Sequence, residues 1–546
     1  MAQFRFLLVL FFGTLFDMSG CGRVGFEQSP DAVTDTADLG SETVSEPDTV
    51  SSDSAEVFDS GTGGADTPLD TVTEASLDTV ADFKTETLDP ETETLDSGTD
   101  TDSASGTDSD TATDTSTVCP ALAGRLTVSD ITVAADIQYG FTGYNFLSKY
   151  AGVVADVHES GAIFIAFKEQ GRDVVHVMPV TDDLQQAGPD TEVAALDVID
   201  MVAQIDGVAL LVRLVDTGDN VAVDTAETPQ KAVALTRIQN GITTFTTLLT
   251  GCDGVDGELD YNNTSDPGGR LAWNGSFYGA YFVVRGGVGH PDEGVYSDKL
   301  VYLNDSGTQV GGGIYFACGG NQGLDLLATH PTWFTALCLA ESTPNPGLNT
   351  VDKFASSSHW LSPEETSGGY VGATMGNAVT MSDGSYAVAW LSRGWNAGTG
   401  AAAHDDRDIV LLHLDDSLAP THTPQVLART PDVEELALHM VPYGSNGVLL
   451  LWDEVTNLTC SSGACFGTFQ STRVQLLTWS GTTWQGAPSV SLAVGSPADR
   501  KLAKAPNGDI LFAYIEDTPD YSTPNPSRIF PGRNTIHVAR IRYCTQ

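Results

Sequence analysis

Asp383-Gly384-Ser385-Tyr386-Ala387-Val388-Ala389-Trp390 is the stretch of this 546-residue chain that decides its fold. An Asp-Gly pair readily adopts the positive φ angles of a tight hairpin turn. The residues that follow it are small, β-branched or aromatic, as in a half-buried or buried strand. The stretch therefore predicts a turn that leads into the second strand of a β-hairpin.

The same sequence pattern, a turn ending in Gly followed by an apolar stretch, recurs throughout residues 119–546. In one degenerate copy Thr332 takes the place of the Gly. With these residues as anchors, successive copies are separated by 46, 68, 57, 52, 63 and 61 residues. The seven turns are Ser160-Gly161, Asp206-Gly207, Asn274-Gly275, Pro331-Thr332, Asp383-Gly384, Asn446-Gly447 and Asn507-Gly508.

A further β-rich segment follows most copies, as in residues 173–178 and 408–414, and long amphipathic helical patterns are absent. The repeating unit is therefore three or four antiparallel strands in about 60 residues. Seven such units resemble the blades of a β-propeller, which implies an all-β, seven-bladed ring. Tandem β-sandwiches are the alternative, but they predict non-repeating strands and a Pro/Gly linker near the middle.

A propeller ring usually closes when an N-terminal strand pairs with the last blade. Residues 126–128 and 131–133 are the candidates for that strand, and a Cys119–Cys544 disulfide would lock the seam. Two further candidate disulfides are Cys460–Cys465 and Cys318–Cys338, which would leave Cys252 over. Zinc is a poor alternative because the cysteines do not form two closely spaced pairs.

Residues 27–118 differ in composition from the rest of the chain. They hold 25 acidic residues and one Lys, which is half of the net charge of −48. Such a segment buries too little apolar surface to offset the entropy of ordering, so we expect a disordered tether about 50–60 Å long or longer. A calcium-collecting tail and a glycosylated Ser/Thr stalk are the alternatives.

The first 21 residues carry Arg5, an apolar run over 6–12, and Ser19-Gly20 before Cys21. This order describes a secretory signal peptide, and a cysteine at the cut resembles the lipobox of bacterial lipoproteins. The resemblance implies cleavage after residue 20, a lipid such as palmitate on Cys21, and membrane attachment. Gly22, by resemblance to lipoprotein sorting, favours the outer membrane. The start and the tether also resemble surface lipoproteins of myxobacteria-like bacteria. The expected domains are 1–20, 21–118 and 119–546.

Signals for chemistry are weak. Nucleophile elbows, zinc-protease helices and phosphate loops are all missing from the sequence. A sialidase-like propeller would bring arginines such as Arg270, Arg285 and Arg393 together at the pore. The best metal candidate is a Gly-rich acidic loop that offers carboxylates to calcium, although without EF-hand spacing. Its residues are Asp253, Asp256, Glu258 and Asp260.

Two classes of function remain. The acidic balance excludes a nucleic-acid partner, because nothing basic is available to displace counterions from phosphates. The first hypothesis is a membrane-anchored module whose propeller binds extracellular proteins or glycans. The second is an extracellular glycan hydrolase or lyase, which needs convergent acid, base or metal groups at the pore. A pore lined by apolar and small residues alone would exclude the enzyme.

Overall fold

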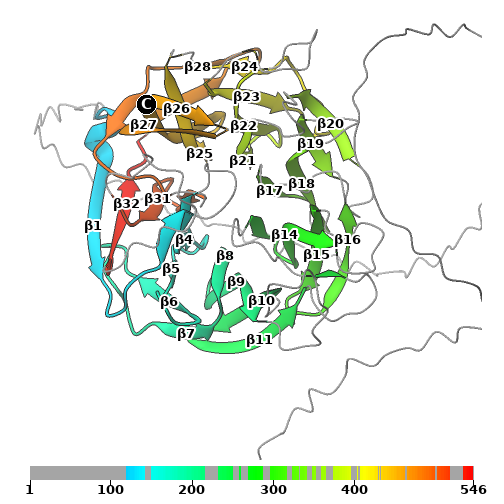
Figure 1. The fold of residues 1–546 in the computed structure, drawn as a ribbon, viewed down its shortest axis with the longest axis vertical. Coiled ribbons are helices and arrows are strands. Elements are labelled where there is room, and N and C mark those ends of the chain that lie inside the picture. The colour runs from blue at the N-terminus through cyan, green and yellow to red at the C-terminus, as the bar shows by residue number, and fades with distance from the viewer. Residues whose placement is uncertain are drawn as a thin grey trace, which may run out of the picture. The chain divides into compact units, whose positions relative to one another are not determined.

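A computed structural model shows a seven-bladed β-propeller (Figure 1). Apart from one 3-10 turn, η1 (Leu122–Arg125), the part of the chain that it describes forms strands and loops only. The described residues are 119–141, 149–215, 231–249, 258–259, 268–286, 296–315, 323–330, 332–340, 347–351, 358–364, 373–394, 403, 406–427, 430, 432–461, 464–497, 501–516 and 533–544.

Each blade is an antiparallel sheet of four main strands, which follow one another in the chain from the centre of the ring outward, except that the outermost strand of blade 7 is the N-terminal β1. Blades 1 to 4 are β4 (Val153–Val157), β5 (Ile163–Lys168), β6 (Val174–Val180) and β7 (Thr191–Ala194); β8 (Asp197–Gln204), β9 (Gly207–Val215), β10 (Lys231–Gln239) and β11 (Ile242–Leu248); β13 (Gly269–Trp273), β14 (Phe277–Gly286), β15 (Tyr296–Asn304) and β16 (Gln309–Tyr315); and β17 (Leu324–His330), β18 (Trp333–Ala340), β19 (Gly347–Val351) and β20 (Ser358–Pro363).

The remaining three blades complete the ring. Blades 5 to 7 are β21 (Thr374–Thr380), β22 (Tyr386–Ser392), β23 (Asp408–Leu414) and β24 (Gln425–Val426); β25 (Val433–Tyr443), β26 (Gly447–Ser461), β27 (Ala464–Trp479) and β28 (Trp484–Gly486); and β30 (Ala503–Lys504), β31 (Ile510–Tyr514), β32 (Thr535–Ile541) and β1 (Leu126–Thr132). Short strands β12 (Glu258–Leu259) and β29 (Val490–Leu492) extend blades 3 and 6, and β2 (Tyr139–Phe141) pairs with β3 (Lys149–Ala151).

All seven repeated turns connect the first strand of a blade to its second strand, as the sequence predicts. Gly161 and Gly384 have the expected positive φ angles of 90° and 85°. The turn of blade 6 differs, because its positive φ of 67° is at Gly444 and Gly447 already belongs to β26. The repeated sequence pattern therefore identified every blade, although not every turn geometry.

The ring closes in blade 7, where the N-terminal strand β1 pairs with the C-terminal strand β32 from Leu126↔Ile541 to Thr132↔Thr535. A disulfide joins Cys119 to Cys544, one of the candidate pairs, with their Cα atoms 5.9 Å apart. The Tyr443 hydroxyl of blade 6 accepts hydrogen bonds from Arg125 Nη1 at 2.9 Å and from the Cys544 backbone N–H at 3.2 Å. Both ends of the ring are therefore bonded to each other and to the neighbouring blade.

The other cysteine predictions fall only partly on described residues. Cys338 is disulfide-bonded, while its candidate partner Cys318 lies outside the described residues. Cys460 and Cys465 face each other across the β26–β27 hairpin as a register pair. Their side chains are not among those described, so a bond between them stays a prediction.

Apolar side chains fill the spaces between neighbouring blades. One cluster combines residues of blades 2, 3 and 4, including Leu211, Phe282 and Phe334. Gly279 lets blades 3 and 4 approach closely, because a Cβ atom there would lie 2.6–2.8 Å from the Phe334 ring. Tyr281 of the same strand is fully buried in this cluster.

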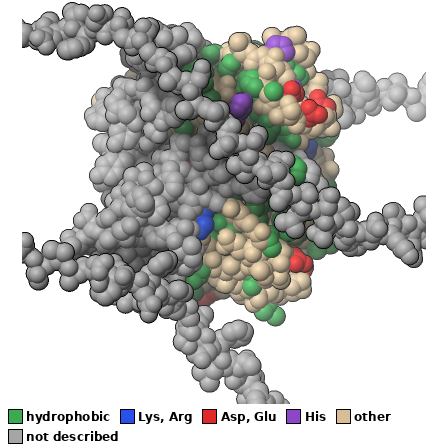
Figure 2. Space-filling view, turned by 90° about the vertical axis from the view of Figure 1, so that its right-hand side faces the viewer, with side chains coloured by type: hydrophobic (Ala, Val, Ile, Leu, Met, Phe, Trp, Pro, Cys, Tyr) green, Lys and Arg blue, Asp and Glu red, His purple; other side chains and the backbone are tan. Residues whose placement is uncertain are grey.

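The outer surface is mixed in character. On the face drawn in Figure 2, the hydrophobic side chains of the described residues are scattered among polar and acidic ones. No helix among the described residues is long and apolar enough to span a membrane. The predicted signal peptide, Cys21 and the acidic tether lie outside the described residues.

Candidate functional site: the central cavity

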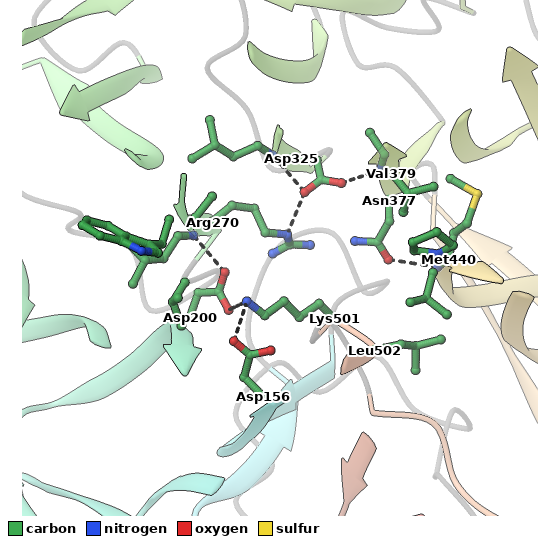
Figure 3. Close-up of a pocket in the computed structure, with 17 residues that line it drawn as sticks. Asp156, Asp200, Arg270, Asp325, Asn377, Val379, Met440, Lys501 and Leu502 are labelled. Carbon is green, nitrogen blue, oxygen red and sulfur yellow. Dashed lines mark hydrogen bonds and ion pairs between the residues drawn. The ribbon is translucent and has the colours of Figure 1, made fainter. Parts of the chain in front are cut away.

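The innermost strands surround a cavity of about 300 Å³ at the centre of the ring, which we call the central cavity (Figure 3). Every blade contributes to its lining, because the first strand of each blade faces the axis. The lining residues are Asp156, Asp200, Val202, Arg270, Leu271, Ala272, Trp273, Asp325, Leu326, Asn377, Ala378, Val379, Met440, Val441, Pro442, Lys501 and Leu502.

Four polar side chains of the cavity link one blade to the next by accepting a backbone N–H from the neighbouring inner strand. The distance from the accepting oxygen to the backbone nitrogen is 2.8 Å for Asp156 and Asp200 and 3.1 Å for Asn377. The pairs are Asp156 Oδ2 with Ala203 N, Asp200 Oδ2 with Leu271 N, Asp325 Oδ2 with Ala378 N, and Asn377 Oδ1 with Met440 N. These side chains therefore hold the inner ring together while they line the cavity.

Blades 3 and 7 place cations at the equivalent positions. Lys501 Nζ lies 3.4 Å from Asp156 and 3.9 Å from Asp200, and Arg270 Nε lies 3.6 Å from Asp325. In Figure 3 both cationic side chains reach from their blades toward the middle of the cavity. The five charged groups thus form two ion-paired sets, one around Lys501 and one around Arg270.

Burial and the ion pairs shift the ionisation of two of these groups. Burial by itself lowers the pKa of Lys501, but Asp156 and Asp200 outweigh it, so the pKa is raised and the ammonium stays charged. Burial raises the pKa of Asp325, and the attraction of Arg270 and two backbone N–H groups does not fully offset it. Asp325 is therefore protonated more readily than an ordinary aspartate.

Hydrogen-bond donors remain in the cavity after these contacts are made. The only hydrogen bond that Arg270 donates within the described residues runs from Nη1 to the Gly269 carbonyl, at 2.9 Å. Its buried Nε makes no hydrogen bond there and has only the longer ion pair to Asp325. Asn377 uses its carbonyl oxygen for Met440, which leaves the amide N–H groups directed toward the Arg270 guanidinium (Figure 3). The arrangement is chemically suited to receive an acceptor-bearing ligand.

The cavity is not the apolar pore that would exclude an enzyme. It contains three carboxylates and two cations, and Asp325 has a raised pKa of the kind found in proton donors. However, both Asp200 oxygens and both Asp325 oxygens accept backbone N–H groups. Because these carboxylates are held by the fold, the geometry supports binding more directly than it supports acid–base catalysis.

Only one of the described residues that the sequence suggested for a functional site lines the central cavity. Of the proposed arginines, Arg270 lines the central cavity and Arg393 lies after β22, outside that lining, while the Arg285 side chain is not among those described. Of the calcium candidates, Asp253, Asp256 and Asp260 lie outside the described residues, and Glu258 pairs its backbone with Gly286 in β12. Within the part of the chain that is described, no group of three His, Cys, Asp or Glu side chains is placed to hold a metal.

One predicted acidic loop is instead part of the interior. From its sequence, the stretch His-Asp-Asp-Arg-Asp at residues 404–408 is expected to be a solvated loop, with a calcium site as the alternative, but Arg407 is fully buried and Asp408 is 4% exposed. Arg407 Nη1 lies 3.0 Å from Glu434 Oε1 of blade 6, and both side chains are completely inaccessible. The interpretation as a solvated loop was wrong for these two residues, because an acid on the neighbouring blade compensates the buried charge.

Asp156, Asp200, Asp325, Asn377 and Lys501 were all missed from the sequence. A signal for them exists, because each is a polar residue shortly before a repeated turn, four of them in the first strand of a blade and Lys501 just before β30. Asp156 precedes its anchor by five residues, and the other four precede theirs by seven. Side chains alternate between the two faces of a strand, so positions five and seven residues before the turn lie on the same face. An alignment of the seven repeats at their turn residues would therefore have identified these polar residues from the sequence.

No protein-family model matches the chain, and no curated protein is similar to it. Among solved structures, a protein of unknown function from Dyadobacter fermentans is similar with a TM-score of 0.36 at 11% identity, covering 76% of this chain and 99% of the other. An oligogalacturonate lyase in complex with manganese gives 0.34 at 8% identity, over 76% and 96%. A luciferin-regenerating enzyme gives 0.33 at 9% identity, over 76% and 95%. Likenesses at this level support no inference about activity.

Proposed function

We propose that this protein is a lipid-anchored protein of the bacterial outer membrane whose propeller binds an extracellular protein or glycan. The central cavity is the binding site in this proposal. The observation that carries it is the set of donors on Arg270 and Asn377 that face the cavity after the contacts between blades are made. Clefts with a few convergent polar groups are the usual places for ligands.

The binding function is tested with the full chain carrying Cys21→Ser, so that no lipid drives association, on arrays of glycans and extracellular proteins. Ala272→Phe fills the central cavity, and Ala487→Phe adds the same bulk at an exposed position as the matched control. We expect wild type and the control to bind the same ligands and Ala272→Phe to lose them. Equal binding by Ala272→Phe, with an unchanged thermal melt, would place the site elsewhere.

The anchor is a separate part of the proposal and rests on the lipobox resemblance of residues 1–21. Growth of the native host with radioactive palmitate should label the wild-type chain and not the Cys21→Ser variant. A wild-type chain that stays unlabelled, or that fractionates without the membrane, contradicts the anchor and leaves the binding site untouched.

A glycan hydrolase or lyase is the second candidate, and the raised pKa of Asp325 is the observation that favours it. It predicts new reducing ends or unsaturated products from polysaccharides, lost in Asp325→Asn. That substitution keeps an acceptor oxygen for only one of the two backbone N–H groups that donate to Asp325, so the thermal melt of the variant is compared with that of wild type. Binding without turnover on the same polysaccharides rejects the enzyme and keeps the binding module.

A further inference from the structure

We propose that the central cavity recognises the carboxylate of an acidic sugar, held by the Arg270 guanidinium and the Asn377 amide. The inference rests on the proposed binding function and names its ligand class. The hydrogen-bonding capacity that the fold leaves unused in the cavity consists mainly of donors, and a carboxylate consists only of acceptors.

Arg270 supplies the planar part of the site. Its guanidinium projects to the middle of the central cavity from β13, while the aspartate beside it is held by the backbone of blades 4 and 5 (Figure 3). The separation of 3.6 Å between Arg270 Nε and Asp325 Oδ1 is too long for a hydrogen bond. The guanidinium therefore keeps N–H groups for a ligand, and its fork matches the two oxygens of a carboxylate.

Asn377 supplies a donor of fixed orientation. Because the Met440 N–H occupies Oδ1 at 3.1 Å, the amide nitrogen must point the other way, toward Arg270. The side chain is 5% exposed and its position on β21 is set by the ring of contacts between blades. A carboxylate on Arg270 would therefore meet a second donor without any rearrangement of the blades.

The charge of the cavity has to allow an anion. Three aspartates and two cations give a formal charge of −1 when all are ionised. The aspartate oxygens are turned to backbone N–H groups and to Lys501, which reduces the field that they present to a ligand. Burial raises the pKa of Asp325, the aspartate next to Arg270, and two backbone N–H groups donate to its oxygens, so it repels an anion less than an exposed aspartate would.

The rest of the lining favours a sugar over a simple acid. Trp273 borders the central cavity while its indole packs against Tyr278, with ring centroids 4.4 Å apart, so it supplies a fixed aromatic part of the lining. Remaining lone pairs of Asp156 and Asp200 can accept sugar hydroxyl groups. A volume of about 300 Å³ is at the small end of ligand sites, which suits one terminal sugar residue.

The test compares D-glucuronate with D-glucose, which differ in the carboxylate, by calorimetry on the full chain carrying Cys21→Ser. It adds arrays of oligosaccharides that end in either sugar and acidic peptides as an alternative source of carboxylate. Asn377→Asp keeps the acceptor for Met440 but replaces the donor with a negative oxygen. Asn304→Asp, in a turn where Oδ1 is likewise the acceptor, is the matched control. Arg270→Gln is compared with Arg473→Gln, whose ion pair of 3.5 Å lies outside the cavity.

We expect the acidic sugar to bind at least tenfold more tightly than its neutral counterpart. Asn377→Asp and Arg270→Gln should each weaken acidic-sugar binding by tenfold or more, while both controls stay within twofold. Equal affinity for the two sugars, preference for acidic peptides, or insensitivity of a correctly folded Asn377→Asp overturns the carboxylate inference. If neutral ligands bind and Ala272→Phe abolishes that binding, the proposed function survives this failure. If no ligand binds at all, both proposals fail.

Discussion

Replacing Glu435 with Gln should stabilise the protein at neutral pH. Glu435 is 3% exposed on β25, directly opposite Glu454 in the register of β25 and β26. Its Oε2 has no hydrogen-bond partner among the described residues. Burial first, and then the nearby Asp408 and Glu434 carboxylates, raise the pKa of Glu435 from 4.5 to about 9. The folded state therefore holds this proton at pH 7, and the unfolded chain releases it.

The sign follows from linkage. Between pH 4.5 and 9 the folded state binds one proton more than the unfolded state, so stability falls as the pH rises through this window and levels off above it. At about 1.36 kcal/mol per pH unit, the interval from 4.5 to pH 7 is worth about 3 kcal/mol. Glu435→Gln removes this dependence. The gain over wild type should be near zero at pH 4, about 3 kcal/mol at pH 7 and larger at pH 9.

Urea denaturation followed by tryptophan fluorescence at these three pH values measures the effect. Glu159→Gln, in the exposed turn after β4, is the matched control and should change the unfolding free energy little. A gain from Glu435→Gln that is the same at every pH would refute the reasoning, because it would come from packing and not from the proton. A variant less stable than wild type at pH 9 would refute it as well.

Three further changes test the ring and its packing. Cys119→Ser removes the closing disulfide and should lower the free energy of unfolding by about 2–5 kcal/mol in the same urea assay, and the double variant Cys119→Ser/Cys544→Ser should lose no more. Arg407→Met leaves Glu434 as an unpaired buried acid and should cost about 3–5 kcal/mol in the same denaturation assay, whereas adding Glu434→Gln, whose amide oxygen can still accept the backbone N–H of residue 407, should restore part of it. Gly279→Ala forces a Cβ against the Phe334 ring and should lower the melting temperature, at a cost of about 1–3 kcal/mol; an unchanged melt would contradict the close approach of the two blades.

The blades were predictable because their signals are local. A turn such as Asp383-Gly384 and the strand after it lie within eight residues, and seven repeats of that pattern already determine the class of fold. Even the closing strand and its cysteines at residues 119 and 544 follow from the rule that a ring must close. In these segments the local sequence preference and the place of the segment in the ring favour the same structure.

The central cavity was not predictable in the same way. Asp200 and Asp325 are single acids inside strands, and nothing near them in sequence shows that their partners are backbone groups of the next blade. Arg407 was assigned to a solvated loop because the acid that neutralises it lies on another blade. Such contacts exist only after the ring has closed, so a single repeat contains no trace of them.

The Cys119–Cys544 bond also determines how the propeller would bear mechanical load. A pull that reaches residue 119 from the preceding chain divides at the disulfide, with one path into β1 and the other through Cys544 into β32. Both strands of the seam are then pulled together, and the tension does not peel β1 away from its partner one hydrogen bond at a time. Without the bond, the whole force would enter through β1 alone, at the outer edge of blade 7. The disulfide thus protects the seam from being peeled open by a pull that enters the propeller at residue 119.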